Sequence, residues 1–442
     1  MMSDDRSLVA RFESRTATIG VVGLGYVGLP LSLEFTDVGF DVSGFDIDER
    51  RVDRLLAGDS YVDDVGDDEL EAGLDDGFEA ASDPKILAGA DAFVIAVPTG
   101  FDRGNPSMDA VEAAASTIAD QQRGEALVVV TSTVYPGATR NVVAPIVAGS
   151  DGEGSVHVAM VPERLNPGGD VQFTDIPLVT GANTLPARRA TATLFDTVVS
   201  EVHKVDSTET AELSKTLENT YRTVNIALVN ELVEFAEATG MDLWGAIEAA
   251  ETKPFGFQAF RPGPGVGGHC IPVDSRFLTW CAEQQGTELS LIGNANRVNS
   301  SMPSTVVDRF ETALVARGFD PGDTSIVALG ASYKKNVGDV RNSPALKIIE
   351  ELSGDVTAID PHVDREDVPA PLVRRKNDNS TVFQSADAAI VLVNHDSFDL
   401  TTVVNSVPFV FDTRAVVPRT GSADVLILGE LAAGLNPVTT SS

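Results

Sequence analysis

The chain reads Thr18-Ile-Gly-Val-Val-Gly23-Leu-Gly25-Tyr-Val-Gly28-Leu-Pro30 near its start. An apolar run of strand length, residues 18–23, leads directly into the glycines, and an amphipathic stretch follows over residues 29–38. A second strand-like run covers residues 41–46. Strand, glycine-rich turn, helix and strand in this order predict the beginning of a βαβ unit with a parallel sheet.

The glycine-rich turn also predicts a dinucleotide site. Its glycines permit a tight turn and allow backbone N–H groups at a helix N-terminus to approach a pyrophosphate. Asp46 ends the second strand, where a carboxylate would accept hydrogen bonds from ribose hydroxyls and repel a 2′-phosphate, which favours NAD over NADP. The neighbouring Arg50 and Arg51 weaken that preference slightly. A plain glycine-rich turn is the alternative; the expected cofactor set is Gly23, Gly25, Tyr26, Val27, Gly28, Asp46 and Arg51.

The rest of the chain separates into regions of different periodicity. Strand-like runs at residues 92–97, 126–131, 156–161 and 176–180, with helical patterns such as residues 108–120 between them, predict a doubly wound parallel sheet. A long amphipathic helix without a breaker is then expected from Ser207 to Gly240, both as a spacer and as a dimer contact. Its apolar residues recur at Leu213, Leu217, Tyr221, Val224, Leu228 and Leu232.

Beyond that helix, residues 253–273 are rich in Gly and Pro, which predicts a loop, and a helix is expected around residues 303–317. The α/β alternation then resumes, with strands at residues 325–329, 356–360, 388–393 and 409–412 and a helix at 344–352. We therefore expect an α/β protein with two Rossmann-like doubly wound domains joined by a central helical region. The expected domains are residues 1–205, 206–305 and 306–442.

The charge of the chain excludes several classes of partner. Lys and Arg total 32 against 66 Asp and Glu, a net charge of −34 with a pI near 4.3. So acidic a protein would repel nucleic acid and anionic lipid, and its scattered acids fit adaptation to high salt. The longest apolar runs are too short for a membrane span and the first 15 residues lack a signal-peptide pattern, so we expect a cytoplasmic protein. Only two cysteines are present, which argues against a disulfide framework or a multi-cysteine zinc site, and no metal is expected.

Two groups of residues carry candidate chemistry. Cys270 ends the glycine-rich stretch Arg261-Pro-Gly-Pro-Gly-Val-Gly-Gly-His-Cys270, and Asp274 follows four residues later. Such a cysteine is either a reachable nucleophile or a loop residue without a chemical task; a zinc site is less favoured. Lys215 and Asn219 lie one turn apart on the long helix, where they could polarise an oxyanion or could belong to a solvated face.

As a set, the motifs resemble the UDP-glucose/GDP-mannose dehydrogenase family. They run in the family's order from about residue 18 to 414, over nearly the whole chain. The matching residues are Val21-Val-Gly-Leu-Gly-Tyr-Val-Gly-Leu-Pro30, Val97-Pro-Thr99, Ser132-Thr-Val134 with Pro136-Gly137, Pro162-Glu-Arg164, Glu212-Leu-Ser-Lys215 with Asn219, Asn230-Glu231, Gly267-Gly-His-Cys270 with Asp274, Lys334 with Asp339-Val-Arg341-Asn-Ser-Pro344, and Asp412-Thr-Arg414.

The resemblance implies an N-terminal NAD domain, a dimerising helical middle that contains the cysteine loop, and a C-terminal domain for the UDP-sugar. It implies that Cys270 is the nucleophile, surrounded by Lys215, Asn219 and Asp274. Glu163 matches the acid/base glutamate, with Asp274 as its competitor for activating water. The resemblance places Thr99 and Thr133 near the nicotinamide and the catalytic water. It also implies a set of residues that surround the substrate: Glu163, Arg164, Lys215, Asn219, Arg261, Gly267, Lys334 and Arg341.

The implied reaction is the four-electron oxidation of the C6 alcohol of a nucleotide sugar, through a thiohemiacetal and a thioester on Cys270. Lys215 would favour the thiolate, and both Lys215 and Asn219 would stabilise oxyanions. Pro167 stands where members acting on UDP-glucose often have a second glutamate, so the sequence looks more like the branch acting on UDP-N-acetylmannosamine or UDP-N-acetylglucosamine. Asn336 replaces the usual acid after the lysine pair.

The sequence also allows other hypotheses about the function. UDP-glucose or GDP-mannose could be the substrate of the same mechanism. A two-electron hydroxyacid or polyol dehydrogenase would use Lys215 as the base and leave Cys270 a bystander. A regulator that binds NAD or a nucleotide sugar without turnover fits least, because it needs neither a reachable thiol nor the Lys/Asn face.

Overall fold

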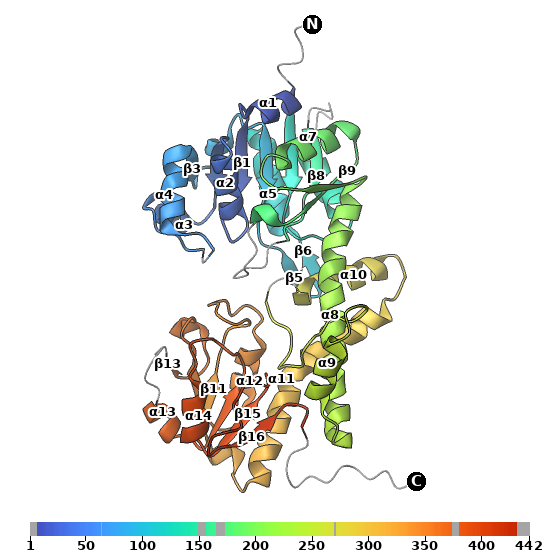
Figure 1. Ribbon diagram of the computed structural model, residues 1–442. Coiled ribbons are helices and arrows are strands. Elements are labelled where there is room, and N and C mark those ends of the chain that lie inside the picture. Colours follow the sequence, from blue (N-terminus) through green and yellow to red (C-terminus); the bar gives the residue numbers. More distant parts are fainter. Residues whose placement is uncertain are drawn as a thin grey trace. The chain divides into compact units, whose positions relative to one another are not determined.

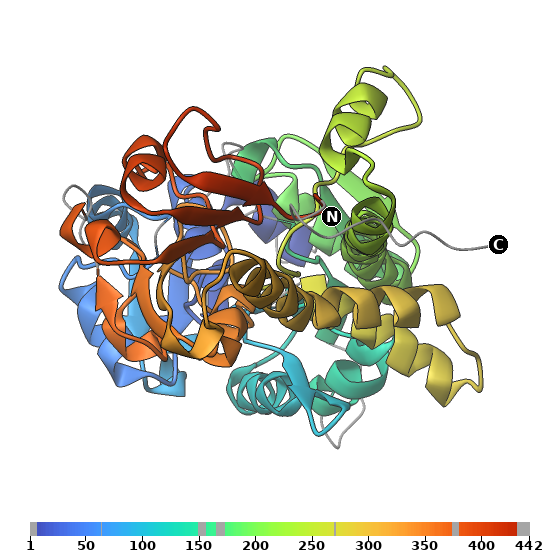
Figure 2. The same ribbon diagram turned by 90° about the horizontal axis from the view of Figure 1, so that it is seen from below.

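The structure is a computed structural model that describes residues 7–62, 64–148, 156–164, 173–268, 271–373 and 380–430. The chain forms two compact units. The first contains Met1–Glu218 and Trp280–Thr287, and the second contains Asn219–Thr279 and Glu288–Ser442. Figures 1 and 2 show the strands and helices of the chain, coloured in sequence order from blue at the N-terminus to red at the C-terminus.

The first unit is built on an eight-stranded sheet in the order β10-β9-β8-β7-β4-β1-β2-β3. Every neighbouring pair is parallel except β8 and β9, which are antiparallel. The expected parallel sheet is therefore confirmed for its central strands and wrong at β9. An antiparallel neighbour needs no crossover helix, and the described part of the β8–β9 connection contains only a short 3-10 turn, Phe173–Asp175. The strands are β1 (Thr18–Val22), β2 (Asp41–Phe45), β3 (Phe78–Ala81), β4 (Ala92–Ile95), β7 (Ala126–Val130), β8 (Val156–Met160), β9 (Leu178–Ala182) and β10 (Val202–Val205).

Apolar side chains cover both faces of this sheet. Along β4, Ala92 and Val94 belong to one buried cluster and Phe93 and Ile95 to another, as the alternation of a strand requires. A small antiparallel hairpin, β5 (Gly100–Asp102) and β6 (Asn105–Ser107), follows β4. The accompanying helices are α1 (Leu8–Ser14), which lies beside α7 (Leu185–Phe195) in Figure 1, α2 (Gly28–Asp37), α3 (Glu49–Leu56), α4 (Asp67–Asp76), α5 (Asp109–Gln121) and α6 (Ala144–Val147).

The predicted long helix is present as α8 (Thr208–Thr239). Ser207 Oγ accepts a hydrogen bond from the Thr210 N–H at 3.1 Å, which caps the first turn. Gly240, with φ +69°, ends the helix in a left-handed conformation. Residues of α8 up to Glu218 belong to the first unit and those from Asn219 to the second.

The second unit contains a six-stranded, fully parallel sheet in the order β13-β12-β11-β14-β15-β16. This arrangement confirms the second Rossmann-like lobe. Its strands are β11 (Ser325–Leu329), β12 (Asp355–Ile359), β13 (Leu372–Val373), β14 (Ala388–Val391), β15 (Phe409–Asp412) and β16 (Asp424–Ile427). Its helices are α9 (Leu243–Glu251), α11 (Ser290–Ala316), α12 (Pro344–Glu351), α13 (Ser380–Gln384) and α14 (Leu400–Ser406).

Two predictions about this region are corrected by the structure. Helix α10 (Ile271–Gln284) begins inside the segment predicted as a loop, because Pro272 falls in the first helical turn, where backbone N–H groups have no partner in any case. Helix α11 begins thirteen residues before Pro303, which lies buried in its interior. Packing around Pro303 compensates for the lost backbone hydrogen bond, so a proline that we placed near a helix start lies within the helix.

Candidate active site

The glycine-rich turn of the first unit has the tight geometry that a dinucleotide site requires. Gly23 has φ +93°, and a Cβ there would lie 2.5 Å from the Ala96 carbonyl oxygen. A Cβ on Gly28 would lie 1.8 Å from the Gly23 carbonyl oxygen, so only glycine fits at the start of α2. A Cβ on Gly25 would meet nothing within 4 Å, which leaves its backbone open to a ligand.

Asp46 fastens this turn to the end of β2. Its Oδ2 accepts the Leu24 N–H at 2.9 Å and its Oδ1 accepts the Asp48 N–H at 2.9 Å. Arg51 Nη1 lies 3.6 Å from Oδ2, and the Asp46 residue is only 5% exposed. Asp46 therefore positions the turn in addition to its proposed contact with a ribose. Tyr26 and Val27, the other expected cofactor residues, lie between Gly25 and the start of α2.

The carboxyl ends of β4 and β7 bring two more predicted residues together. Thr99 Oγ1 donates a hydrogen bond to the Thr133 carbonyl oxygen at 2.6 Å. Ser132 Oγ accepts the Val97 N–H at 2.9 Å and donates to the Val97 carbonyl oxygen at 2.7 Å. Ligands of doubly wound sheets bind beyond the carboxyl ends of their strands, and these two segments lie there.

Glu163 and Lys215 form a buried pair. Lys215 Nζ lies 3.6 Å from Glu163 Oε2, and their side chains are 7% and 12% exposed respectively. The other carboxylate oxygen, Oε1, is buried and has no hydrogen-bond partner among the described residues. Burial raises the pKa of Glu163, although the Lys215 ammonium opposes the shift. A carboxylate that is partly unsatisfied and whose pKa is raised is suited to accept a proton.

Arg164, expected at the substrate, has partners within the first unit. Its guanidinium pairs with the Glu218 carboxylate of α8 at 2.7 Å and donates to the Pro177 carbonyl oxygen. Arg164 therefore ties the segment that carries Glu163 to the same helix that carries Lys215.

The second unit contains the other predicted pair of α8. Asn219 Nδ2 donates to Asp274 Oδ2 at 2.5 Å, and these residues are 7% and 1% exposed. The contact joins α8 to the first turn of α10. Cys270 and His269, which precede that turn, lie outside the described residues.

The described residues before Cys270 are fixed by backbone contacts. The Gly268 N–H donates to the Arg341 carbonyl oxygen at 2.9 Å, and Asn342 Nδ2 donates to the Gly268 carbonyl oxygen at 3.1 Å. A Cβ on Gly267 would lie 2.7 Å from both Pro344 Cδ and Tyr333 Cβ, so a larger residue cannot replace it without movement. The loop before Cys270 and the segment around Arg341 are thus brought together.

Three predicted cations belong to the second unit. The Arg341 guanidinium bonds to Asp339 at 2.6–3.0 Å and is half exposed. Lys334 is partly buried, and its carbonyl oxygen accepts from Ser332 Oγ at 2.8 Å. Arg261 pairs with Glu251 at 2.6 Å near the surface. Acidic partners hold two of these cations in place in a strongly acidic protein.

The sequence did not indicate the roles of three further groups. The Glu212 carboxylate is fully buried and accepts the N–H groups of Gly137 and Thr139. Arg414 Nε donates to the Leu392 carbonyl oxygen at 2.8 Å, and burial lowers the pKa of Arg414 to about 10. His395 contacts Asp360 beyond β12. Glu212 and Arg414 were visible as motif residues, but nothing in the sequence indicated these partners.

Within the described ranges, no cluster of three or more His, Cys, Asp or Glu side chains could hold a metal ion. No helix among the described residues is long and apolar enough to cross a membrane.

Models of one protein family match the chain in three consecutive segments. The NAD binding domain of the UDP-glucose/GDP-mannose dehydrogenase family matches residues 17–199, its central domain matches 209–301 and its UDP binding domain matches 327–419. The chain belongs to this family. It is an NAD-dependent nucleotide-sugar dehydrogenase, and the family resemblance drawn from its motifs is confirmed.

Relatives named for different sugars are about equally similar to the chain. It is 35% identical over 399 residues to an NDP-N-acetyl-D-galactosaminuronic acid dehydrogenase of Ralstonia nicotianae, covering 86% of this chain and 91% of that protein. It is 32% identical over 394 residues to a UDP-N-acetyl-D-glucosamine 6-dehydrogenase of Salmonella typhi, covering 86% and 90%. The solved structure of a UDP-D-ManNAc dehydrogenase from Pyrococcus horikoshii superimposes with a TM-score of 0.85 at 30% identity, covering 93% and 99%.

Proposed function

We propose that the protein oxidises the C6 hydroxyl of a UDP-N-acetylhexosamine to the carboxylate, with UDP-N-acetylmannosamine or UDP-N-acetylglucosamine as substrate. The relatives that act on such sugars support the sugar class. The observation that carries the chemistry is a pair of buried polar contacts on α8. Lys215 meets Glu163 and, one helical turn later, Asn219 meets Asp274.

The proposed domains follow the three family segments. Residues 1–205 would bind NAD, with the turn containing Gly23, Gly25, Tyr26, Val27 and Gly28 at the pyrophosphate. Residues 206–305 would form the helical region with the cysteine loop, and 306–442 the UDP-sugar domain. NAD, when bound, accepts a hydride in each oxidation step. Asp46 and Arg51 would contact its ribose, and Thr99 and Thr133 would lie near its nicotinamide.

The proposed reaction begins at the sugar's C6 alcohol. Loss of the hydroxyl proton to solvent and of a hydride from C6, which bound NAD would take up, would leave an aldehyde. The Cys270 thiolate adds to the aldehyde carbon to form a thiohemiacetal, whose oxyanion Lys215 and Asn219 stabilise. Loss of a second hydride from the same carbon to a second NAD gives a thioester.

Hydrolysis then completes the oxidation. Glu163 takes a proton from water, whose oxygen attacks the thioester carbon, and the C–S bond breaks to release the sugar acid and the Cys270 thiolate. The acid then loses its remaining proton to solvent and leaves as the carboxylate. Asp274 is the competing base, but its described contact with Asn219 favours a role in orienting that amide. Arg164, Gly267, Lys334, Arg341 and Arg261 are the proposed substrate contacts, with Lys334 and Arg341 facing the diphosphate.

The two cysteines offer a matched test of this mechanism. Cys281 lies half-buried with Sγ 3.9 Å from the Pro136 carbonyl oxygen, and burial raises the pKa of Cys281 to about 11, which makes its thiolate scarce. We expect Cys270→Ser to lower kcat at least about a thousandfold and Cys281→Ser to leave it within a factor of three, as removal of a covalent nucleophile would. Full activity in Cys270→Ser would instead support a two-electron dehydrogenase with Lys215 as base.

The sugar is decided by a comparison of substrates. Rates are compared for UDP-N-acetylmannosamine, UDP-N-acetylglucosamine, UDP-glucose and GDP-mannose. The first two sugars carry an acetamido group at C2, where the other two carry a hydroxyl. We expect kcat/KM to be at least about a hundredfold higher for an acetamido sugar. A preference for UDP-glucose or GDP-mannose would retain the mechanism and change the proposed substrate.

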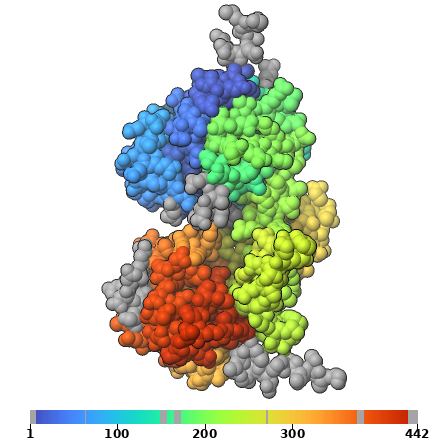
Figure 3. Space-filling view, in the orientation of Figure 1, coloured from blue at the N-terminus to red at the C-terminus, as the bar shows by residue number. Residues whose placement is uncertain are grey.

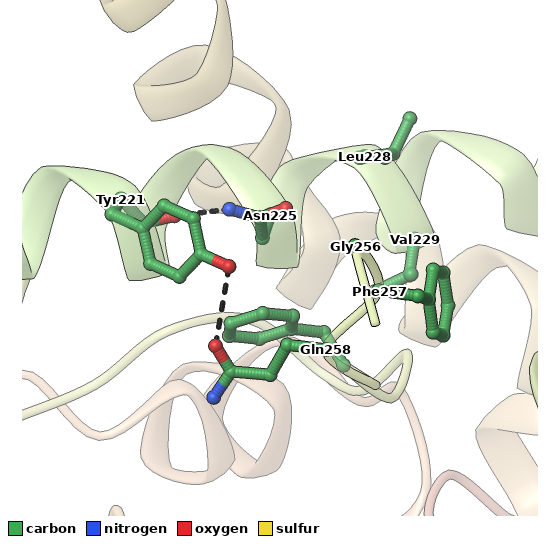
Figure 4. Close-up of a pocket in the computed structure, with 8 residues that line it drawn as sticks. Tyr221, Asn225, Leu228, Val229, Gly256, Phe257 and Gln258 are labelled. Carbon is green, nitrogen blue, oxygen red and sulfur yellow. Dashed lines mark hydrogen bonds between the residues drawn. The ribbon is translucent and has the colours of Figure 1, made fainter. Parts of the chain in front are cut away.

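We also propose that the protein is a homodimer that pairs through α8. Tyr221, Leu228 and Phe235 recur at seven-residue intervals and remain about half exposed. This spacing is the one by which a helix packs against another helix. Beside them, a pocket of about 480 Å³ is lined by Tyr221, Asn225, Leu228, Val229, Gly256, Phe257, Gln258 and Phe260, with Tyr221 Oη hydrogen-bonded to Gln258 (Figure 4).

This stretch of the chain reaches the surface in the view of Figure 3, where it is yellow-green. Leu228→Glu should convert the dimer to a monomer in light scattering, while Glu248→Gln on α9 should not. A wild type that is monomeric at all protein concentrations would contradict the proposal.

Localisation and salt adaptation complete the proposed function. We place the enzyme in the cytoplasm, where NAD and nucleotide sugars are made available, and in a high-salt environment that screens its net charge of −34. Dialysis to low salt should reduce its helical circular dichroism. An unchanged spectrum would contradict adaptation to salt.

A further inference from the structure

The segment that carries Lys334 has an unusual anchor. The segment follows β11, and in a Rossmann-like domain the first helix usually begins soon after the first strand. Here the next helix, α12, begins only at Pro344. Residues 330–343 therefore have to be fixed by contacts other than those of a helix. Within this segment, Ser332 Oγ donates to the Lys334 carbonyl oxygen at 2.8 Å.

His395 supplies the central contact. It is 3% exposed, and its Nδ1 accepts the Asn336 N–H at 2.9 Å. Its Nε2 lies 3.1 Å from Asp360 Oδ2 and 3.3 Å from Ser332 Oγ. Because Nδ1 accepts a hydrogen bond, it carries no proton, and the neutral ring must have its proton on Nε2, directed at the carboxylate.

Asp360 fixes the other side of the ring. It is fully buried, and its Oδ2 also accepts the N–H groups of Ala331 and Ser332 at 2.8 and 3.1 Å. Burial alone would raise the pKa of Asp360, but hydrogen bonds and charge from His395, together with the backbone N–H groups, lower it overall. The carboxylate therefore remains ionised and can accept the Nε2 proton.

Asn336 explains a departure in the sequence. It has φ +61°, a left-handed conformation that Asn tolerates. Its Nδ2 donates to Asp396 Oδ2 at 2.7 Å, and its Oδ1 accepts the Asp396 N–H at 3.0 Å. An acid at this position could not donate to Asp396 and would repel it. Lys335 Nζ also pairs with Asp396 at 2.6 Å, so residues 335–336 are fastened to residues 395–396.

We propose that His395 and Asn336 are positioning residues that hold the Lys334 segment in the conformation that binds the nucleotide diphosphate. The inference rests on the proposed function, because it assigns Lys334 to the substrate. In this arrangement His395 Nδ1 supplies the acceptor that holds the Asn336 N–H, and Asp360 holds the opposite side of the ring.

Two substitutions separate the hydrogen-bond acceptor from the rest of the ring. In His395→Asn, Oδ1 can take the place of Nδ1; in His395→Leu the acceptor is lost. Binding of UDP and of NAD to each variant is measured by calorimetry at high salt.

We expect His395→Leu to weaken UDP binding about tenfold, as loss of a buried hydrogen bond would. His395→Asn should keep UDP affinity within about threefold of the wild type, because it retains the acceptor. NAD affinity should stay at the wild-type value in both. His203→Asn, on the edge strand β10, is the matched control, and its UDP affinity should equal that of the wild type.

The outcomes distinguish the inference from the proposed function. A His395→Leu variant with wild-type UDP affinity, or a His395→Asn variant that binds UDP as weakly as His395→Leu, would overturn the inference alone. A wild type that binds NAD but neither UDP nor any nucleotide sugar would overturn the proposed function and the inference with it. If His395→Leu fails to fold, His395→Asn and Asn336→Asp still decide, because Asn336→Asp should weaken UDP binding several-fold through repulsion from Asp396.

Discussion

The turn after the first strand of each unit, β1 or β11, has the same backbone contacts, but the chain that follows the turn differs between the units. Gly23 and Gly330 both have a positive φ, and their N–H groups donate to the ends of β2 and β12, to Phe45 and Ile359. In each unit an aspartate one residue further on, Asp46 or Asp360, accepts backbone N–H groups of the turn. In the first unit α2 begins at Gly28, whereas in the second α12 begins only at Pro344.

The difference shows how one fold serves two ligands. A helix that starts directly after the turn offers N–H groups to a pyrophosphate and needs no cation. A long segment in place of that helix can carry the side chains of Lys334 and Arg341 but needs its own supports. His395 and Asn336 provide them, and the first unit has no counterpart of this pair among its described residues.

The largest expected effect separates chemistry from binding. Glu163→Gln retains the size of the side chain beside Lys215 but cannot accept a proton, so kcat should fall by about 10²–10⁴. UDP affinity, which we assign to the second unit, should not change. Because burial raises the pKa of Glu163, wild-type kcat/KM should fall as the pH drops through that raised pKa, and the pH profile of the variant should lack this limb. A variant with wild-type kcat would remove Glu163 from the mechanism.

A substitution in the first turn should abolish cofactor binding without affecting the second turn. Gly28→Ala places a Cβ 1.8 Å from the Gly23 carbonyl oxygen, so the turn must open. Overpacking of this kind costs about 3 kcal/mol, which corresponds to a loss of NAD affinity of about a hundredfold. Gly25→Ala is the matched control for folding, since its Cβ meets nothing within 4 Å. Normal NAD binding by Gly28→Ala would contradict the assignment of the turn.

The two aspartates offer a reciprocal test. Asp46→Asn and Asp360→Asn each replace one acceptor oxygen with a donor that faces backbone N–H groups. Fluorescence titration should show NAD binding about tenfold weaker in the first variant and UDP binding about tenfold weaker in the second. Each should leave the other ligand unaffected. Equal losses of both ligands in both variants would mean that the turns do not act separately.

A further prediction concerns stability rather than activity or binding, and it again distinguishes the units. Burial raises the pKa of Glu212 in the first unit to about 7, despite the hydrogen bonds from Thr139 and Gly137. The stabilisation is complete below the unfolded pKa near 4.5 and is lost as pH rises through 7, by about 3 kcal/mol. Glu212→Gln does not titrate, so its Tm relative to wild type should rise by a few degrees between pH 5 and 8.

The measurement is the difference between the two melting curves at constant high salt. Parallel dependence of Tm on pH in the two proteins would contradict the raised pKa of Glu212. Glu248→Gln, exposed on α9, serves as the control with no expected change in that difference.

The sequence predicted those features that depend on local pattern. The strand–glycine–helix order of the first unit, the span of α8 and the parallel second sheet all follow from periodicity and breakers. Pro303 inside α11 and the antiparallel β9 did not, because tertiary packing and the path of a connection decide them. Some contacts between site residues could not be predicted from local pattern either. Glu163 and Lys215 are 52 positions apart in the sequence, and Asp360 and His395 are 35 positions apart.

The number of NADH molecules formed for each nucleotide sugar consumed tests the proposed four-electron oxidation directly. It is measured at high salt with the preferred sugar and limiting substrate, by absorbance of NADH and chromatography of the product. We expect a ratio of two and a uronic acid, because a four-electron oxidation reduces NAD twice. A ratio of one with an accumulated aldehyde or ketone would contradict it and leave Cys270 without a catalytic role.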